Sequence, residues 1–211
     1  MSPRLSRAEQ NDRNRALLLA AALRVFLARG YHAATLEQIA DEAGFSKGVV
    51  YSRFASKADM FLALLTARID ERAMQNASAA GQPASPGDLA GLLDLAWLAE
   101  RAAPGWRLLV TEFRVHAARD PELGRRYAAA HARTVDGLTS VVASLAERNG
   151  HALALPARQL AELLLAIETG ITLEQLARPQ AAGFPELPAV LSQLAALLAG
   201  APASGGVPEL R

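Results

Sequence analysis

The sequence predicts an all-α protein of about nine helices, and three observations carry this prediction. Apolar residues recur every three or four positions along most of the 211 residues, which is the period of a helix and not of a strand. Hydrophobic residues make up 51% of the chain, enough to bury a sizeable core. Glycines, prolines and helix-capping residues stand between the periodic segments, where helices begin and end.

Four helices are expected in the first part of the chain. Thr35 and Ser56 are suited to cap the starts of helices, and Gln38 is placed three residues after Thr35 to complete a capping box. Gly30 and Gly44 stand where a glycine ends a helix. The expected ranges are about residues 10–29, 35–43, 46–54 and 56–76.

Five more helices are expected after a loop rich in glycine, proline and serine at residues 76–87. Asp120 is a suitable cap followed by Pro121 at the first helical position, and Pro156 and Pro179 bracket another helix. The tail 201–211 is expected to be disordered. The expected helices span about residues 88–102, 104–118, 120–149, 156–177 and 184–199.

Charge is unevenly distributed, although the net charge is only +1. Residues 1–57 hold nine Lys/Arg against five Asp/Glu, a net charge of +4, and the remainder holds thirteen against sixteen, a net charge of −3. A basic first quarter favours a surface that faces a polyanion, although chance scatter of surface charge is an alternative. Without cysteine, a disulfide framework, a thiolate zinc site and a cysteine nucleophile are excluded. We expect a cytoplasmic protein, because we find no signal-peptide pattern and no long uncharged apolar run.

The two short helices and the glycine between them form a helix-turn-helix pattern. Ala40 is small enough for a close helix crossing, and Gly44 supplies a turn position with positive φ. The residues expected to pack the two helices together are Ile39, Ala43, Phe45 and Val50, which leaves Ser46, Lys47, Gly48, Tyr51 and Ser52 facing outward. Such a face of small, hydroxyl and basic groups suits a DNA major groove and its phosphates.

Tyr51 and Lys57 are the expected phosphate contacts. Tyr51 can donate its hydroxyl hydrogen to a phosphate, and Lys57 stands at the start of the following helix, whose backbone amides add partial positive charge. The alternative for each residue taken singly is an ordinary place on the surface of a helical bundle. Arg4, Arg7 and Arg13 are candidates for a basic arm that reaches DNA, with a solvated disordered tail as the alternative.

Residues 15–65 resemble the N-terminal region of the TetR (tetracycline repressor) family. The likeness includes the Phe-x-x-x-Gly-Tyr end of the first helix and continues through Thr35, Ile39-Ala40, Ala43-Gly44, Ser46-Lys47-Gly48, Tyr51, Phe54 and Lys57. The rest of the chain is similar to that family only in helix number and length. The resemblance implies a dimeric transcription regulator, usually a repressor, that a small ligand releases from DNA.

The resemblance also implies positions of DNA contact and a domain division. The implied contacts are Thr35, Ser46, Lys47, Gly48, Val49, Tyr51 and Lys57. Val49 departs from the pattern, because threonine is frequent there, and its methyl groups suit a thymine methyl instead. We expect a DNA-binding domain at residues 1–57, with a flexible arm at 1–9, and a ligand-binding and dimerisation domain at 58–200.

Aromatic and polar residues on the central helices are candidates for a ligand pocket. They are Trp97, Trp106, Glu112, Phe113, His116, Tyr127, His131 and Glu168. Ordinary packing is the alternative for each. Glu112 and His116 share a helix face and suit a polar ligand or, with His131, a metal, although a solvated pair is the alternative. The expected effector is a small, largely apolar molecule, and we assign no cofactor, metal or catalytic site.

The sequence also bears on two other classes of protein. A helical enzyme is disfavoured, because the sequence has no glycine-rich phosphate loop, no nucleophile elbow and no convincing metal-ligand spacing. An architectural DNA-binding protein is disfavoured because about 110 residues of apolar helix exceed what such a role needs.

The last two expected helices carry apolar stripes that suggest a homodimer. The first stripe is Leu160, Leu164, Ile167 and Ile171, with Gly170 beside it, and the second includes Val190, Leu191, Leu194 and Leu198. Two such helices from each chain can form a four-helix interface. The alternative is that both stripes face the chain's own core.

Overall fold

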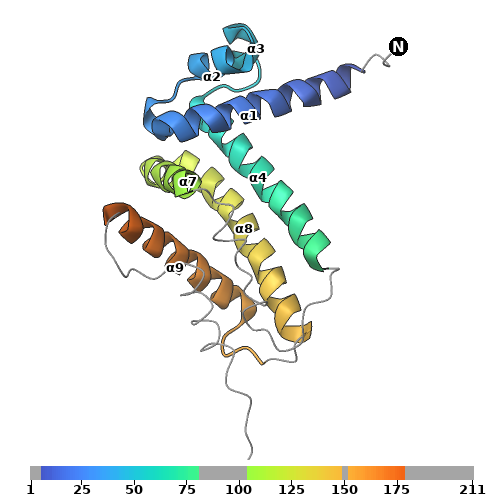
Figure 1. Ribbon diagram of the computed structural model, residues 1–211, viewed down its shortest axis with the longest axis vertical. Helices are drawn as coiled ribbons and strands as arrows, with labels where there is room; N and C mark the ends of the chain where they lie inside the picture. Colours follow the sequence, from blue (N-terminus) through green and yellow to red (C-terminus); the bar gives the residue numbers. More distant parts are fainter. Residues whose placement is uncertain (1–5, 81–103, 149–151, 179–211) are drawn as a thin grey trace, which may run out of the picture. The chain divides into compact units, whose positions relative to one another are not determined.

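The computed structural model describes residues 6–80, 104–148 and 152–178, and these are helical with no strand among them (Figure 1). The all-α prediction is therefore confirmed. The helices expected at 88–102 and 184–199 lie outside the described residues. The described helices are α1 (Arg7–Ala33), α2 (Leu36–Ala43), α3 (Lys47–Tyr51), α4 (Lys57–Ala80), α7 (Pro104–Ala117), α8 (Pro121–Arg148) and α9 (Ala157–Ala177).

The chain divides into two compact units. The first comprises Met1–Arg72 and Leu108–His131, so it joins α1 to α3 and most of α4 with most of α7 and the start of α8. The second comprises Ala73–Arg107 and Ala132–Arg211. The helix-turn-helix segment thus shares its unit with residues that lie far along the sequence.

Helix α1 begins at Arg7, about three residues earlier than expected. The cause is a capping box that the sequence prediction missed: the Ser6 hydroxyl accepts a hydrogen bond from the Glu9 amide (3.2 Å), and the Ser6 amide donates to the Glu9 carboxylate (2.7 Å). These bonds from Ser6 hold the pKa of the Glu9 carboxyl below its usual value. Arg7 and Arg13 are consequently helical residues and not part of a flexible arm, and Arg4 lies outside the described residues.

Gly30 interrupts α1 with φ of 74° and ψ of 169°, a backbone conformation that glycine alone adopts readily. The helix resumes for a further turn to Ala33. Glu112 of α7 fills the space at this break, where its carboxylate accepts a hydrogen bond from the Tyr31 amide (2.7 Å). A Cβ atom on residue 30 would lie only 3.1 Å from the same carboxylate oxygen. Both the backbone conformation and the contact with Glu112 therefore favour glycine here.

Four aromatic side chains from α1, α4 and α7 form the centre of the first unit. We call Phe26, Tyr31, Phe61 and Phe113 the aromatic cluster, and all four are almost completely buried. The Phe61 ring stacks on Phe113 (4.3 Å between centroids) and meets Phe26 and Tyr31 edge to face (5.4 and 5.5 Å). These offset-stacked and edge-to-face contacts are the geometries that aromatic rings prefer, so the cluster fixes how the three helices pack.

A separate apolar core holds α8 and α9 together in the second unit. Its buried members are Leu138, Val142, Leu160, Ala161 and Leu164, and the partly buried Leu153, Ala157, Leu165, Ile167 and Ile171 pack against them. At the surface of this core, Arg158 of α9 forms an ion pair with Asp136 of α8 (2.6 Å). Exposed ion pairs of this kind contribute little stability, so the apolar contacts are the main link between the two helices.

Candidate nucleic-acid interface

Helix α2 begins with the capping box that the sequence predicts. The Thr35 hydroxyl accepts a hydrogen bond from the Gln38 amide (3.3 Å), and the Thr35 amide donates to the Gln38 side-chain oxygen (3.1 Å). Both bonds satisfy donors that the first turn of a helix would otherwise leave without partners. One lone pair of the Thr35 hydroxyl is therefore already used within the protein.

The turn between α2 and α3 is fixed by Gly44. This residue adopts the left-handed conformation (φ 70°, ψ 27°), and the following amide, that of Phe45, donates to the Ala40 carbonyl (2.9 Å). Beneath the turn, Ile39, Ala40 and Val50 are fully buried, so α3 is packed rigidly against α2. A five-residue helix such as α3 is too short to be stable alone and depends on this packing.

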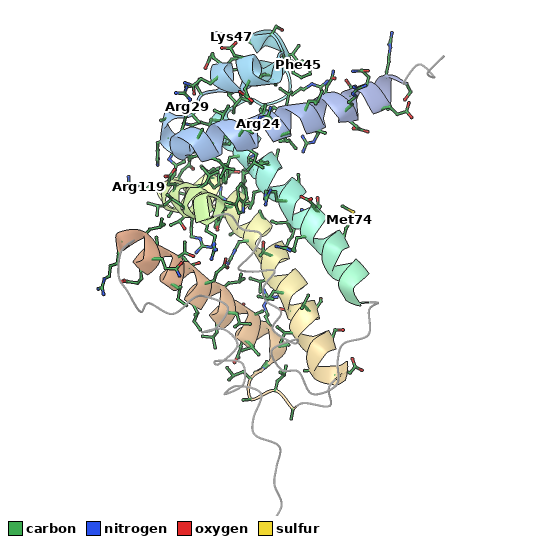
Figure 2. The ribbon with its side chains drawn as sticks, viewed as in Figure 1. Arg24, Arg29, Phe45, Lys47, Met74 and Arg119 are labelled. Atoms are coloured by element: carbon green, nitrogen blue, oxygen red, sulfur yellow. The ribbon has the colours of Figure 1, made fainter. Side chains whose placement is uncertain are left out.

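Helix α3 presents small and basic groups at the surface, although it is shorter than the expected range of 46–54. Ser46, Lys47, Gly48, Tyr51 and Ser52 are exposed, and Val49 is half-buried. Figure 2 shows Lys47 at the edge of this unit, on the side of α2 and α3 that faces away from α4. These side chains are exposed among the described residues, so a large ligand such as DNA has access to them.

Tyr51 has a different hydrogen-bond partner from the one expected. Its hydroxyl donates to the Glu37 carboxylate of α2 (2.5 Å), although the side chain is 48% exposed. This bond is the main cause that holds the pKa of the Glu37 carboxyl below its usual value, and contacts with the backbone and Thr35 add to it. The same bond raises the pKa of the Tyr51 hydroxyl. Since the single hydroxyl hydrogen goes to Glu37, Tyr51 does not offer it to a phosphate in this geometry.

Lys57 also has a partner within the protein. Its ammonium group donates to the His32 carbonyl at the end of α1 (2.8 Å) and lies 4.8 Å from the centroid of the Tyr31 ring. Burial lowers the pKa of Lys57. The lysine thus satisfies a carbonyl that the helix end leaves without a partner. An ammonium group carries three hydrogens, so this bond leaves capacity for a phosphate.

The sequence prediction gave no role to Arg53, which ties α1 to the end of α3. Its guanidinium group donates to the side-chain oxygen of Asn11 (2.9 Å), and Arg15 of α1 lies over the buried Phe54 ring (5.9 Å). These contacts join the N-terminal half of α1 to the residues that follow α3. No local sequence signal identifies the Arg53–Asn11 pair, because the residues are 42 positions apart.

The structure gathers five of the eight candidate ligand residues in the first unit. Phe113 belongs to the aromatic cluster, and Glu112 binds the Tyr31 amide. Tyr127 accepts a hydrogen bond from Arg114 (2.8 Å) and stacks on His131, and His116 lies 5.1 Å from the Tyr31 ring. Among the described residues, no three His, Asp or Glu side chains gather as a metal site, so the arrangement of Glu112, His116 and His131 as metal ligands is not formed.

The other three candidates lie elsewhere. Trp106 and Glu168 belong to the second unit and are half-buried, and Trp97 lies outside the described residues. The structure therefore does not place all eight residues around one site.

The expected dimer residues of α9 are buried within their own chain. Leu160 and Leu164 pack into the core shared with α8, and Ile167 and Ile171 lie against that core. This intramolecular packing is the alternative that the sequence left open for this stripe, so a partner has no access to Leu160 and Leu164. Val190, Leu191, Leu194 and Leu198 lie outside the described residues.

A neighbouring face of α9 carries a second apolar row, to which the sequence prediction gave no role. Leu163, Ala166, Gly170, Leu173 and Ala177 follow one another at spacings of three, four, three and four, and all five are exposed. We call these five residues the outer row of α9. A Cβ atom added to Gly170 would contact none of the described residues within 4 Å, so a larger side chain fits at this position.

Two family models match the chain in succession. "Bacterial regulatory proteins, tetR family" matches residues 18–64, and "BetI-type transcriptional repressor, C-terminal" matches residues 101–200. Together they span well over half of the sequence. The first covers the α2–α3 segment described above.

Proteins of similar sequence match the N-terminal region of this chain. The HTH-type transcriptional activator FasR of Mycolicibacterium smegmatis is 51% identical over 59 residues, which is 28% of this chain and 27% of the relative. The chain thus matches about a quarter of the length of that relative.

Solved structures match over most of the chain. A TetR transcription regulator from Haloarcula marismortui covers 89% of this chain and 98% of its own, with a TM-score of 0.68 and 20% identity. The regulator FadR from Bacillus subtilis in complex with stearoyl-CoA covers 87% and 97%, with a TM-score of 0.65 and 17% identity. At these identities the likeness is one of fold.

Proposed function

The chain belongs to the TetR family of bacterial regulatory proteins, and we propose that it is a ligand-responsive repressor that binds a palindromic operator as a homodimer. The observation that carries this proposal is the exposed face of α3, with Lys47 at its start, held rigidly on α2 by Gly44 and Val50. A recognition helix of a helix-turn-helix enters the major groove by its N-terminal residues. The net charge of +4 on residues 1–57 favours the approach to DNA.

We expect DNA binding to be strongly dependent on salt, and Lys47→Ala to weaken it. The logarithm of affinity should fall against the logarithm of salt concentration with a slope of about −0.9 for each phosphate neutralised, so loss of one lysine contact makes the slope shallower by about 0.9. Gel-shift titrations on the intergenic DNA beside the gene, at several salt concentrations, measure this slope.

Arg178→Ala is the matched control, since it removes the same charge from the exposed end of α9 in the other unit. It should leave the slope unchanged. Binding that is absent or insensitive to salt in the unmodified protein contradicts the DNA-binding proposal. Equal effects of both substitutions contradict the role of Lys47.

The dimer proposal rests on the outer row of α9. Its spacing of three and four residues is the pattern by which two helices pack along a shared seam, and small residues such as Ala166 and Gly170 allow close approach. A palindromic operator requires two recognition helices about 34–36 Å apart, which only a dimer supplies.

The release mechanism that we propose runs through polar contacts from α7 and α8 to the DNA-binding helices. Glu112 of α7 binds the Tyr31 amide at the break in α1, and Arg126 of α8 binds Asp59 in the first turn of α4 (2.6 Å). The Ser56 hydroxyl, beside Lys57, donates to the Asp59 carboxylate (2.7 Å) and accepts from the Asp59 amide (3.0 Å), which caps the start of α4. A ligand that moves the α7–α8 region therefore shifts the ends of α1 and α4, on which α2 and α3 depend.

The proposed effector is a small, largely apolar molecule, because the candidate ligand residues are mostly aromatic. Long-chain fatty acids supply such an apolar chain, and long-chain acyl-CoA thioesters supply it with a charged CoA group. Both are first probes, since a structure of similar fold was solved with stearoyl-CoA. A probe at 100 times its dissociation constant should raise the free energy of unfolding by about 2.7 kcal/mol if it binds only the native state. Thermal-shift screening detects this.

Each stabilising compound is then tested for release of operator DNA in a gel shift. A ligand shifts the equilibrium only if it binds the DNA-free conformation more tightly. If every stabilising compound leaves operator affinity unchanged, the ligand-gated proposal fails and an architectural role is favoured. Turnover of a compound without DNA would instead indicate an enzyme. A reporter gene behind the operator distinguishes repression from activation.

A further inference from the structure

The pair formed by Glu37 and Tyr51 is unusual for a surface that faces DNA, and this inference rests on the proposed DNA-binding function. Glu37 is in the first turn of α2, and Tyr51 is the last residue of α3, so the pair bridges the two helices of the motif. The tyrosine oxygen and the carboxylate oxygen are 2.5 Å apart, and the ring is half-exposed. The contact places a negative charge beside the recognition helix.

The direction of this hydrogen bond follows from the chemistry of the two groups. Glu37 is ionised at neutral pH, because its pKa is held below the usual value by Tyr51 and neighbouring groups, and a carboxylate only accepts. The hydrogen must therefore come from Tyr51. What Tyr51 presents to solvent is an oxygen with free lone pairs, an acceptor and not a donor.

An acceptor on this face cannot bind a DNA phosphate, whose oxygens are also acceptors, and the Glu37 charge repels a phosphate further. The complementary groups in a major groove are amino groups, which are N6 of adenine and N4 of cytosine. A hydroxyl that donates to a carboxylate is also a stronger acceptor, because successive hydrogen bonds polarise one another. The hydrogen bond from Tyr51 is the main cause of the lowered pKa of Glu37, and the positive charge of Lys47 adds to it.

We propose that Tyr51, held by Glu37, accepts a hydrogen bond from the amino group of an adenine or cytosine and so determines base preference at one position of each operator half-site. Tyr51 is the specificity-determining residue, and Glu37 is a positioning residue that acts through it. This assignment replaces the sequence-based expectation that Tyr51 is a phosphate donor. Without Glu37, the freed hydroxyl hydrogen becomes available to a phosphate.

Selection from a library of double-stranded oligonucleotides with a randomised core tests the proposal without a known operator. The unmodified protein should enrich a two-fold symmetric motif with an adenine or cytosine preference at one position of each half. Tyr51→Phe keeps the ring and loses the acceptor, so that preference should fall by about 3- to 10-fold, the usual effect of one hydrogen bond. The other motif positions should persist, and affinity for random DNA should not change.

Glu37→Ala should change the affinity for DNA as well as the base preference. It removes a negative charge and frees the Tyr51 hydroxyl, so affinity for random DNA should rise by about 3- to 10-fold while the same base preference is lost. Ser140→Ala is the control, because it removes an exposed hydroxyl of α8, outside α2 and α3, and should leave the motif intact. Circular dichroism melts establish that all variants fold.

Two results overturn the inference while leaving the proposed function in place. One is that Tyr51→Phe enriches the unchanged motif while its affinity for all sequences falls equally, which is the behaviour of a phosphate contact. The other is that Glu37→Ala preserves the base preference. If the unmodified protein enriches no motif, the proposed function itself fails, and this inference fails with it.

Discussion

Phe61→Ala is expected to lower the free energy of unfolding by about 3–5 kcal/mol, the usual cost of deleting a fully buried aromatic ring. The Phe61 side chain is 0% exposed and contacts Phe26, Tyr31 and Phe113, which come from both ends of the first unit's sequence. The substitution would therefore remove contacts that α4 makes with both α1 and α7. Urea denaturation followed by circular dichroism measures the loss.

Leu17→Ala is the matched control, because this α1 side chain is 47% exposed. Its effect should stay within about 0.5 kcal/mol, as for most surface substitutions. A loss below about 1 kcal/mol for Phe61→Ala would show that the aromatic cluster is not the core of this unit. A large loss should be accompanied by loss of DNA binding, since α2 and α3 are held in place by α1.

Gly170→Glu is expected to convert the proposed dimer into monomers and to weaken binding to a palindromic operator by about 100-fold or more, because the second half-site no longer binds as a linked unit. Gly170 lies in the middle of the outer row of α9, between Ala166 and Leu173. A glutamate there would place a charge in an apolar seam. Light scattering measures the mass, and gel shifts on full and half palindromes measure the affinity.

This substitution separates dissociation from misfolding. The space around Gly170 is open in the single chain, and glutamate favours a helix over glycine by roughly 0.5–1 kcal/mol, so the folded monomer should be at least as stable as before. Ala154→Asp adds the same charge at an exposed residue outside the row and should leave the dimer intact. An unmodified protein that is monomeric at micromolar concentration and still binds a full palindrome tightly would contradict the dimer proposal.

Local signals in the sequence were sufficient to predict most helix boundaries. The Thr35–Gln38 capping box and the left-handed Gly44 were both predicted, because each depends on residues within a few positions. The Ser6–Glu9 capping box has the same kind of signal, a serine followed three residues later by a glutamate, and this local pattern also indicates the start of α1.

Helix α9 shows where periodicity stops being informative. Its two faces are both apolar, so the pattern establishes that α9 is helical without deciding which face is covered by α8. Leu164 and Leu163 are adjacent in the chain, yet the first is fully buried and the second is 44% exposed. Only the packing of the chain distinguishes the face that is used internally from the face that is open to a partner.

The sequence by itself determined the helical class, the helix-turn-helix and the family resemblance, because these depend on spacing between near neighbours. The tertiary structure decided the partners of the polar groups. Tyr51 is 14 residues from Glu37, and Tyr31 is 81 residues from Glu112, and no period or motif links such positions. A hydroxyl or a carboxylate binds whichever complementary group the fold brings within about 3 Å. The direction of each hydrogen bond, and therefore what each residue can offer to DNA, is fixed only when the chain has folded.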